Sequence, residues 1–109
     1  MTAQRDIRST AGDDAGYAVT LFVSGASDLS ARAIYDVRLL CDRQLHGARL
    51  TVVDVHAEPE AALSSRVNVV PTLVRTRPLP VRRVVGDLSQ TARVLSVMLP
   101  GNVEDAAPA

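Results

Sequence analysis

Apolar residues along the chain occur either in short unbroken runs or at spacings of three and four residues. The run Tyr17–Val23 (YAVTLFV) is rich in β-branched and aromatic residues and stops at Ser24 and Gly25, which predicts a mostly buried strand. The next segment has helical spacing, and Ser27 or Asp28 can cap its first turn. The apolar positions of this predicted helix are Leu29, Ala33, Val37, Leu40 and Cys41.

The same two patterns predict the middle of the chain. A second buried strand covers residues 49–56 (RLTVVDVH), and a short helix begins at Glu58 and Pro59 and ends near Asn68. Two further strands, over residues 69–75 and 81–85, are joined by a turn that its prolines stiffen, and Gly86 follows the second of them.

A final helix completes the predicted order βαβαββα. Asp87 or Ser89 can cap it, Pro100 stops it, and its apolar residues are Val94, Leu95, Val97, Met98 and Leu99. The long helix between the first two strands implies a parallel pair, and the tight last turn implies an antiparallel pair. The predicted fold is therefore α/β and thioredoxin-like, a mixed sheet with helices on both faces. Residues 17–99 form this domain, and residues 1–16 and 100–109 are predicted to be flexible tails.

Composition limits the class of partner that the 109-residue chain can bind. Aromatic residues make up 3% of the chain, so the core must be aliphatic, and the formal net charge is zero. A neutral chain with few aromatic rings lacks the usual features of nucleic-acid binding. The sequence shows neither a signal peptide nor an apolar run of membrane-spanning length. We therefore expect a cytoplasmic protein that contacts neither membrane nor nucleic acid.

The residues that could do chemistry argue against catalysis. Thioredoxin-type redox catalysis needs two thiols one turn apart at a helix start, whereas residues 24–28 (SGASD) contain no sulfur. The single cysteine, Cys41, lies on the apolar side of the first helix and is interpreted as a buried structural thiol. His46 and His56 lack the further ligands that a metal site needs, and the sequence has no phosphate-binding loop. These observations predict a protein that is not an enzyme and uses no cofactor.

Three features have more than one interpretation. Asp54 interrupts the second strand near its end, where it either hydrogen-bonds the following turn or lies where a partner docks. The arginines at positions 75, 77, 82 and 83 form either a solvated face or a surface for an acidic protein. Pro71 requires an extended residue before it and is either a static turn proline or a slow cis–trans gate.

Four segments, YAVTLFVSG, SARAIYDV, VVDV and VVPTLVRTRPLPVRRVVGDLS, resemble the KaiB family of circadian clock proteins. The resemblance covers about residues 17–97, and its most specific part runs from PTL to GDLS. It implies a regulator without enzymatic activity that binds the ring-shaped ATPase KaiC and opposes the phosphorylation that KaiA promotes. It also implies two folds of one sequence, a resting form that is usually a homotetramer and a thioredoxin-like monomer that binds KaiC.

The resemblance assigns roles to particular positions. Arg66 falls where clock KaiB proteins carry a basic residue that faces KaiC, and it is the first candidate for a partner contact. Tyr17 and Asp54 match the tyrosine that starts the family's first strand and the acid of its second strand, and they are further candidates. The residues matched to the switching half of the fold are Pro71, Pro78, Pro80, Gly86 and Asp87.

The chain also departs from the family pattern in its last helix. Val97 and Leu99 stand where the resting form tolerates Gly and Asp, and apolar residues there favour a packed amphipathic helix. The sequence is therefore predicted to favour the thioredoxin-like form. The predicted function is regulation of a KaiC-type RecA-fold ATPase, in a clock or a signalling system derived from one, by a monomer or a homo-oligomer (dimer or tetramer). The alternative is a thioredoxin-fold adaptor in bacterial stress signalling with a different protein partner.

Overall fold

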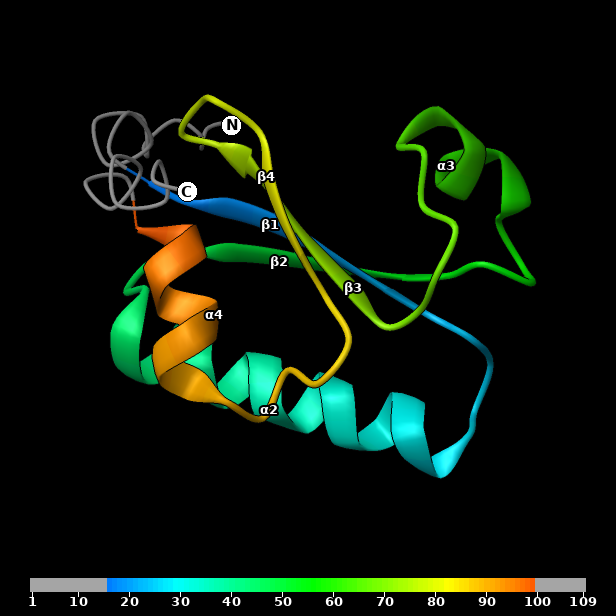
Figure 1. Ribbon diagram of the computed structural model, residues 1–109, viewed down its shortest axis with the longest axis horizontal. Helices are drawn as coiled ribbons and strands as arrows, with labels where there is room; N and C mark the ends of the chain where they lie inside the picture. The colour runs from blue at the N-terminus through cyan, green and yellow to red at the C-terminus, as the bar shows by residue number, and fades with distance from the viewer. Residues whose placement is uncertain (1–15, 100–109) are drawn as a thin grey trace, which may run out of the picture.

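The computed structural model describes residues 16–99, and the element order in this range is the predicted one (Figure 1). The strands are β1 (Ala18–Val23), β2 (Arg49–Asp54), β3 (Thr72–Arg77) and β4 (Arg82–Val85). The helices are α2 (Asp28–Gln44), α3 (Pro59–Ser64) and α4 (Thr91–Met98). The tails predicted over residues 1–16 and 100–109 lie outside the described residues, apart from Gly16.

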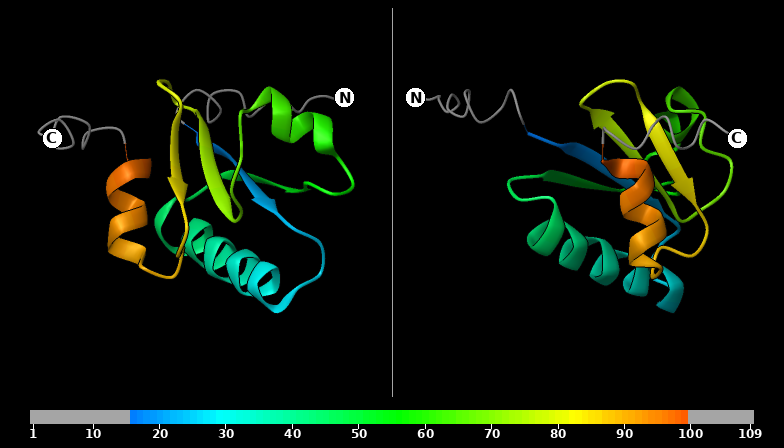
Figure 2. Two further views of the ribbon diagram at one scale, coloured as in Figure 1. Left: turned by 45° about the vertical axis from the view of Figure 1, so that its right-hand side comes forward. Right: turned by 60° about the vertical axis from the view of Figure 1, so that its left-hand side comes forward.

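The strands form one mixed sheet in the order β2-β1-β3-β4. β1 and β2 are parallel, with Val23 opposite Asp54, whereas β3 runs antiparallel to both β1 and β4. Helices α2 and α4 lie together on one face of the sheet, and α3 lies on the other (Figure 2). This arrangement confirms the thioredoxin-like α/β fold.

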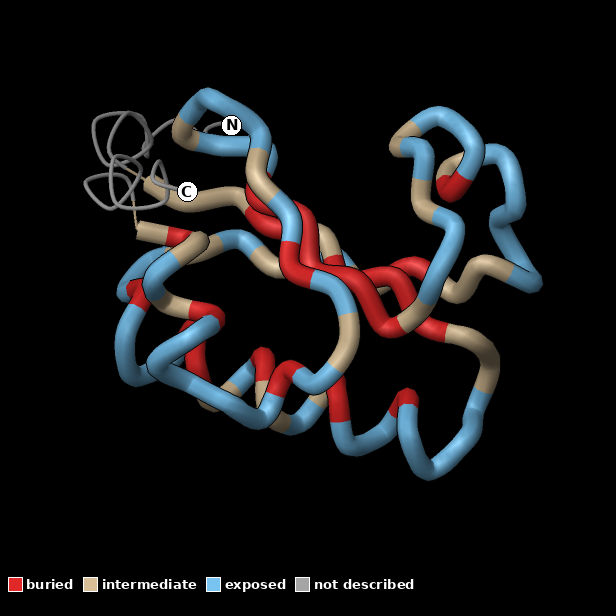
Figure 3. Tube along the Cα trace, viewed as in Figure 1, coloured by how far each residue is buried: buried red, intermediate tan, exposed pale blue. Residues whose placement is uncertain are grey.

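Two hydrophobic cores of unequal size hold the layers together, and buried segments follow the sheet and the inner sides of the helices (Figure 3). The larger core lies under α2 and α4 and is built from Val19, Leu21, Val23, Ala33, Val37, Leu40, Cys41, Leu45, Leu73, Val84, Leu88, Val94 and Met98. The smaller core lies under α3 and is built from Phe22, Val53, Ala62 and Val74. Because hydrophobic stabilisation grows with buried apolar area, the α2 and α4 layer carries most of it.

Helix α2 begins where the sequence predicts. The Ser27 hydroxyl accepts a hydrogen bond from the Ser30 amide at 3.1 Å, which satisfies one of the free amides of the first turn. Cys41 lies inside the larger core, and burial raises the pKa of its thiol, which confirms its assignment as a structural residue. Leu29 was expected on the buried side, but this expectation is wrong, since its side chain is 62% exposed.

Helix α3 has only six residues, and isolated helices of that length are not stable in water. Its C-terminal end is held by Arg83 of β4. The guanidinium of Arg83 donates to the carbonyl oxygen of Ser65 at 2.8 Å and to that of Arg66 at 3.0 Å. These carbonyls lie just beyond the helix, where backbone acceptors lack partners within it, so Arg83 fixes α3 to the edge strand.

Arg75 is fully buried, so the prediction that it belongs to an exposed arginine face is wrong. Alternation along β3 turns Arg75 towards the α2 and α4 face, the face that Leu73 also lines. Its two terminal nitrogens donate to the carbonyl oxygens of Met98 and Pro80, each at 2.7 Å. Burial lowers the pKa of Arg75, although a guanidinium stays charged in proteins. One side chain thus joins β3 to the end of α4 and to the turn before β4.

Several predicted boundaries differ from those of the structure. β3 begins at Thr72 rather than at residue 69, β2 ends at Asp54, and α3 ends at Ser64. The carboxylate of Asp87 accepts hydrogen bonds from the Ser89 amide and hydroxyl, so these residues form a turn and do not cap α4, which begins two residues later. The strand end predicted at Gly86 is confirmed. The bonds preceding Pro71, Pro78 and Pro80 are all cis.

Substitution of Arg75 tests this arrangement. Arg75→Lys keeps a charge but loses the planar fork, so at least one of the two carbonyls loses its partner. We expect the free energy of unfolding to fall by about 1–3 kcal/mol, measured by urea denaturation. Arg77→Lys, at an exposed position on the same strand, is the matched control and should change the value by less than about 0.5 kcal/mol. Equal stability of the two variants would contradict the role given to Arg75.

Candidate partner-binding surface

Arg66 lies in the loop after α3 and is exposed. Its backbone has a φ of 56°, a left-handed conformation that non-glycine residues seldom adopt. The amide of Arg66 bonds to the carbonyl oxygen of Leu63 at 3.0 Å, and its own carbonyl oxygen accepts the hydrogen bond from Arg83. The loop is therefore held by backbone and side-chain hydrogen bonds while the Arg66 side chain stays accessible to a partner.

Apolar side chains are exposed on both sides of Arg66 in the sequence. Leu63 on α3 is 76% exposed, and Val69 in the loop before β3 is 53% exposed. Together with Arg83, which is also exposed, these residues form the α3 surface (Leu63, Arg66, Val69 and Arg83). Arginine is enriched at protein interfaces, and the exposed apolar side chains of Leu63 and Val69 offer area that a partner could bury.

Asp54 ends β2 and joins two loops. One of its carboxylate oxygens accepts hydrogen bonds from the Gly25 amide at 3.0 Å and from the His56 amide at 2.9 Å. These two amides, that of His56 first, hold the pKa of Asp54 below its ordinary value, because they stabilise the charged carboxylate. Of the two interpretations of Asp54, hydrogen bonding to the following turn is confirmed.

Tyr17 lies at the other end of the sheet from Asp54. It precedes β1, its carbonyl oxygen accepts the Arg49 amide at 2.8 Å, and its half-buried side chain packs against the larger core. Asp54 pairs with Val23, which is six residues after Tyr17 in the chain. At the usual rise of a strand, Tyr17 and Asp54 are therefore about 20 Å apart. The structure therefore does not bring the three candidate contact residues together in one small site.

Of the residues matched to the switching half, Pro71, Gly86 and Asp87 lie where β3 begins and β4 ends. The Gly86 amide donates to the carbonyl oxygen of Pro71 at 3.2 Å, and the hydroxyl of Thr72 donates to the carbonyl oxygen of Val69. Gly86 has a φ of 99°, which glycine adopts without strain. The hydroxyl of Ser89, followed by its amide, lowers the pKa of Asp87. Pro78 and Pro80 lie in the turn at the opposite end of these strands.

The start of α2 carries hydroxyls where redox proteins of this fold carry thiols. Ser27 and Ser30 have the spacing of a C-x-x-C motif, and the Ser27 hydroxyl donates to the Ser30 hydroxyl at 3.0 Å. The Ser30 hydroxyl in turn donates to the carbonyl oxygen of Ser24 at 3.0 Å. Residues 24–30 therefore form a hydrogen-bonded network that has no group able to exchange electrons.

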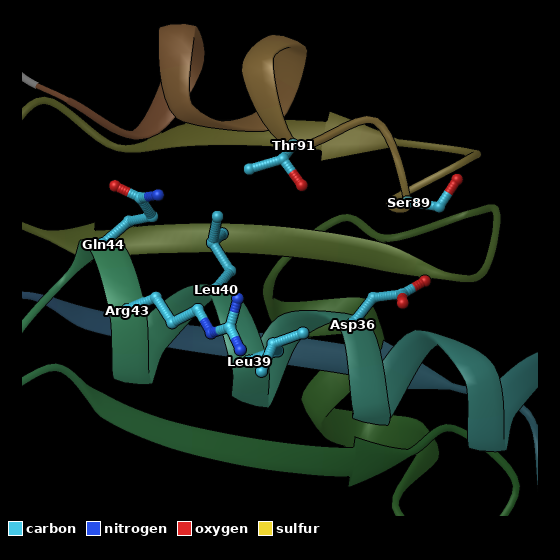
Figure 4. A pocket seen from close by; sticks show the side chains of 7 residues that line it. All are labelled: Asp36, Leu39, Leu40, Arg43, Gln44, Ser89 and Thr91. Carbon is cyan, nitrogen blue, oxygen red and sulfur yellow. The ribbon is translucent and has the colours of Figure 1, made fainter.

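A shallow depression of about 110 Å³ lies between α2 and the start of α4 (Figure 4). Its lining residues are Asp36, Leu39, Leu40, Arg43, Gln44, Ser89 and Thr91. Cofactor and substrate pockets are usually about 300–1,000 Å³, so this depression is too small for such a ligand. Within residues 16–99 the structure shows no cluster of metal-ligating side chains and no helix with the length and apolar character needed to span a membrane.

Sequence reasoning missed one side-chain contact near Asp54. The hydroxyl of Ser24 and Nε2 of His56 are 2.7 Å apart, although the residues are 32 positions apart in the chain. The two residues follow β1 and β2, and the parallel pairing of these strands brings them together. The predicted end of the first strand pointed to Ser24, and His56 was considered only as a metal ligand or as a base paired with Asp54, so no feature of the sequence indicated a contact between Ser24 and His56.

Comparison with known proteins agrees with this geometry. The family model of the KaiB domain matches residues 20–99. Circadian clock oscillator protein KaiB of Synechococcus elongatus is 36% identical over 80 residues, which cover 72% of this chain and 78% of the relative. The same protein of Prochlorococcus marinus strain MIT 9313 is 38% identical over 80 residues, which cover 72% and 67% of the two chains.

Solved structures support the fold. The N-terminal domain of Synechococcus elongatus SasA superposes with a TM-score of 0.63 at 20% identity, over 83% of this chain and 85% of that domain. The thioredoxin Deadhead of Drosophila melanogaster gives a TM-score of 0.63 at 20% identity, over 84% and 88% of the two chains.

The lowered pKa of Asp54 gives a prediction for acid unfolding. A carboxylate with a lower pKa in the folded chain stabilises the fold above its unfolded pKa of about 3.9, and this contribution disappears as the pH falls through the folded value. Asp54→Asn keeps an oxygen acceptor but cannot titrate. Urea unfolding measured from neutral pH into this acidic range should show a shallower loss of stability for the variant than for the wild type, and equal slopes would contradict the role of Asp54.

Proposed function

The chain belongs to the KaiB family, and we propose that it is a non-enzymatic regulator that binds a KaiC-type RecA-fold ATPase and modulates its phosphorylation and ATPase cycle. The observation that carries the proposal is the thioredoxin-like fold of a KaiB domain whose α2 start has hydroxyls in place of thiols. A fold that lacks the redox groups of its structural relatives still offers a rigid surface for a macromolecular partner.

We place the main partner contact on the α3 surface. Arg66 supplies an accessible charge, and Leu63 and Val69 supply apolar area beside it. The two hydrogen bonds from Arg83 fix the end of α3 before the partner binds, so less conformational entropy is lost on association. An acidic patch next to an apolar pocket is the complementary surface expected on the ATPase.

Tyr17 and Asp54 have different roles in this proposal. Asp54 supports the loop that leads into α3, because its carboxylate holds the His56 amide three residues before Pro59 starts the helix. Tyr17 is about 20 Å from Asp54 along the sheet, so a direct contact from Tyr17 requires a partner that covers both ends of the domain. We therefore expect Arg66 to contribute more to partner affinity than Tyr17.

We further propose that the thioredoxin-like form is the binding form and that this chain favours it. Val94 and Met98 of α4 are fully buried, and Val97 and Leu99 pack against the same core. The carbonyl oxygen of Met98 also receives the guanidinium of Arg75. These contacts are made with residues 91–98 in a helix, and they stabilise this form.

The form adopted in solution can be measured directly. Backbone chemical shifts of residues 91–98 should be helical, because packing of Val94 and Met98 stabilises α4. Val97→Gly removes a packed side chain and lowers helix propensity by roughly a few tenths of a kcal/mol, so it should lower the helical population and protection from hydrogen exchange in α4. Extended shifts for these residues in the wild-type chain would contradict the proposal.

Charge reversal at Arg66 tests the partner contact. Arg66→Glu should weaken binding to the KaiC-type ATPase of the same organism by tenfold or more, equivalent to about 1.4 kcal/mol, in a titration followed by fluorescence anisotropy. Arg32→Glu, at an exposed position of α2 on the opposite face, is the matched control and should bind like the wild type. Equal affinities of the two variants would refute the site, whereas a wild-type chain that does not bind the ATPase would refute the function and favour an adaptor with another partner.

A further inference from the structure

Ser24 and His56 form the one hydrogen bond between a hydroxyl and a histidine ring that the described residues show. The Ser24 hydroxyl oxygen lies 2.7 Å from Nε2 of His56, in an exposed environment. With the ring proton on Nδ1, Nε2 accepts the hydroxyl proton, which is the geometry needed to activate a serine oxygen. Both residues lie just beyond the carboxyl ends of the parallel strands β1 and β2, where α/β sheets commonly place functional groups.

The backbone on both sides of this contact is fixed. The hydroxyl of Ser30, which is 4% exposed, donates to the Ser24 carbonyl oxygen at 3.0 Å and lies 3.2 Å from the Ser24 amide, which donates to it. One carboxylate oxygen of Asp54 holds both the Gly25 amide and the His56 amide. Ser24 and His56 are thus each anchored by a side chain that is not itself part of the pair, which preorganises the contact.

We propose that Ser24 is an acyl-acceptor site with His56 as its general base, and that activated acyl esters and thioesters are the donors. The Ser24 oxygen attacks the carbonyl carbon of the donor while its proton passes to Nε2 of His56. The bond from the carbonyl carbon to the leaving oxygen or sulfur then breaks, and the leaving group departs as an anion or takes up the proton. The product is one ester on Ser24 for each chain, with no oxidation or reduction.

The start of α2 follows Ser24 in the same loop, and the positive end of a helix favours negative charge placed next to its first turn. Acylation also removes the hydroxyl proton, so the modified serine can no longer donate to His56. The modification therefore breaks the side-chain link between the loops after β1 and β2, independently of any protein partner.

The experiment uses the full chain and p-nitrophenyl acetate as the acyl donor. Release of p-nitrophenolate is followed by absorbance, and the acetylated residue is located by peptide mass spectrometry. We expect one acetyl group on Ser24. Ser24→Ala should abolish this ester, and His56→Gln should slow its formation by about 100-fold, the lower range for loss of a general base.

Matched controls separate this site from general reactivity. Ser96→Ala removes an exposed hydroxyl of α4, and His46→Gln removes the other histidine, so both variants should be acetylated on Ser24 at the wild-type rate. Circular dichroism and urea unfolding of His56→Gln check that the loop remains folded. Absence of the Ser24 ester in the wild type, acetylation spread equally over other residues, or an unchanged rate in a folded His56→Gln variant would each overturn the proposal.

Discussion

The buried guanidinium of Arg75 is the interaction on which the C-terminal half of the fold depends. A charge in an aliphatic core is costly unless its hydrogen-bonding groups find partners. Here the two terminal nitrogens donate to backbone carbonyls, one at the end of α4 and one in the turn before β4, whereas the buried Nε has no partner among the described residues. Because the charge cannot be removed by deprotonation, these two segments must stay in place around it. The sheet, the turn and the last helix therefore hold together as one unit.

Arg83 has the corresponding role on the other face of the sheet. Arg83 closes the end of α3 with two hydrogen bonds to carbonyl oxygens, and α3 covers only a small core of its own. The two faces thus differ in strength, since the α2 and α4 layer rests on a larger apolar area. A short helix whose end is fixed in this way, with an exposed apolar side chain and the exposed Arg66 next to it, is suited to partner binding because its accessible groups are already positioned.

Most of the fold could be predicted because burial repeats with the period of each element. The runs at Tyr17–Val23 and around Val84, and the helical spacing that includes Val37, gave the element order and the sheet. The inward position of Arg75 could not be predicted, because its hydrogen-bond partners are backbone carbonyls. Every residue has such a carbonyl, so the sequence does not show which of them will bind an arginine. The contact between Ser24 and His56 was missed for a related reason, since parallel pairing brings together residues that are distant in the chain.

The loop beyond the carboxyl end of β1, the strand that is parallel to β2, explains how a protein with this fold can bind a partner instead of carrying out redox chemistry. A thiol at the start of α2 would have a lowered pKa and would react, whereas the Ser27 and Ser30 hydroxyls remain neutral and bond to each other and to the backbone. The hydrogen bonds of these hydroxyls hold the loop in place. The Asp54 carboxylate holds this loop and also the His56 amide in the segment that leads into α3. Rigidity at the start of α2 therefore supports the surface on which a protein partner is proposed to bind.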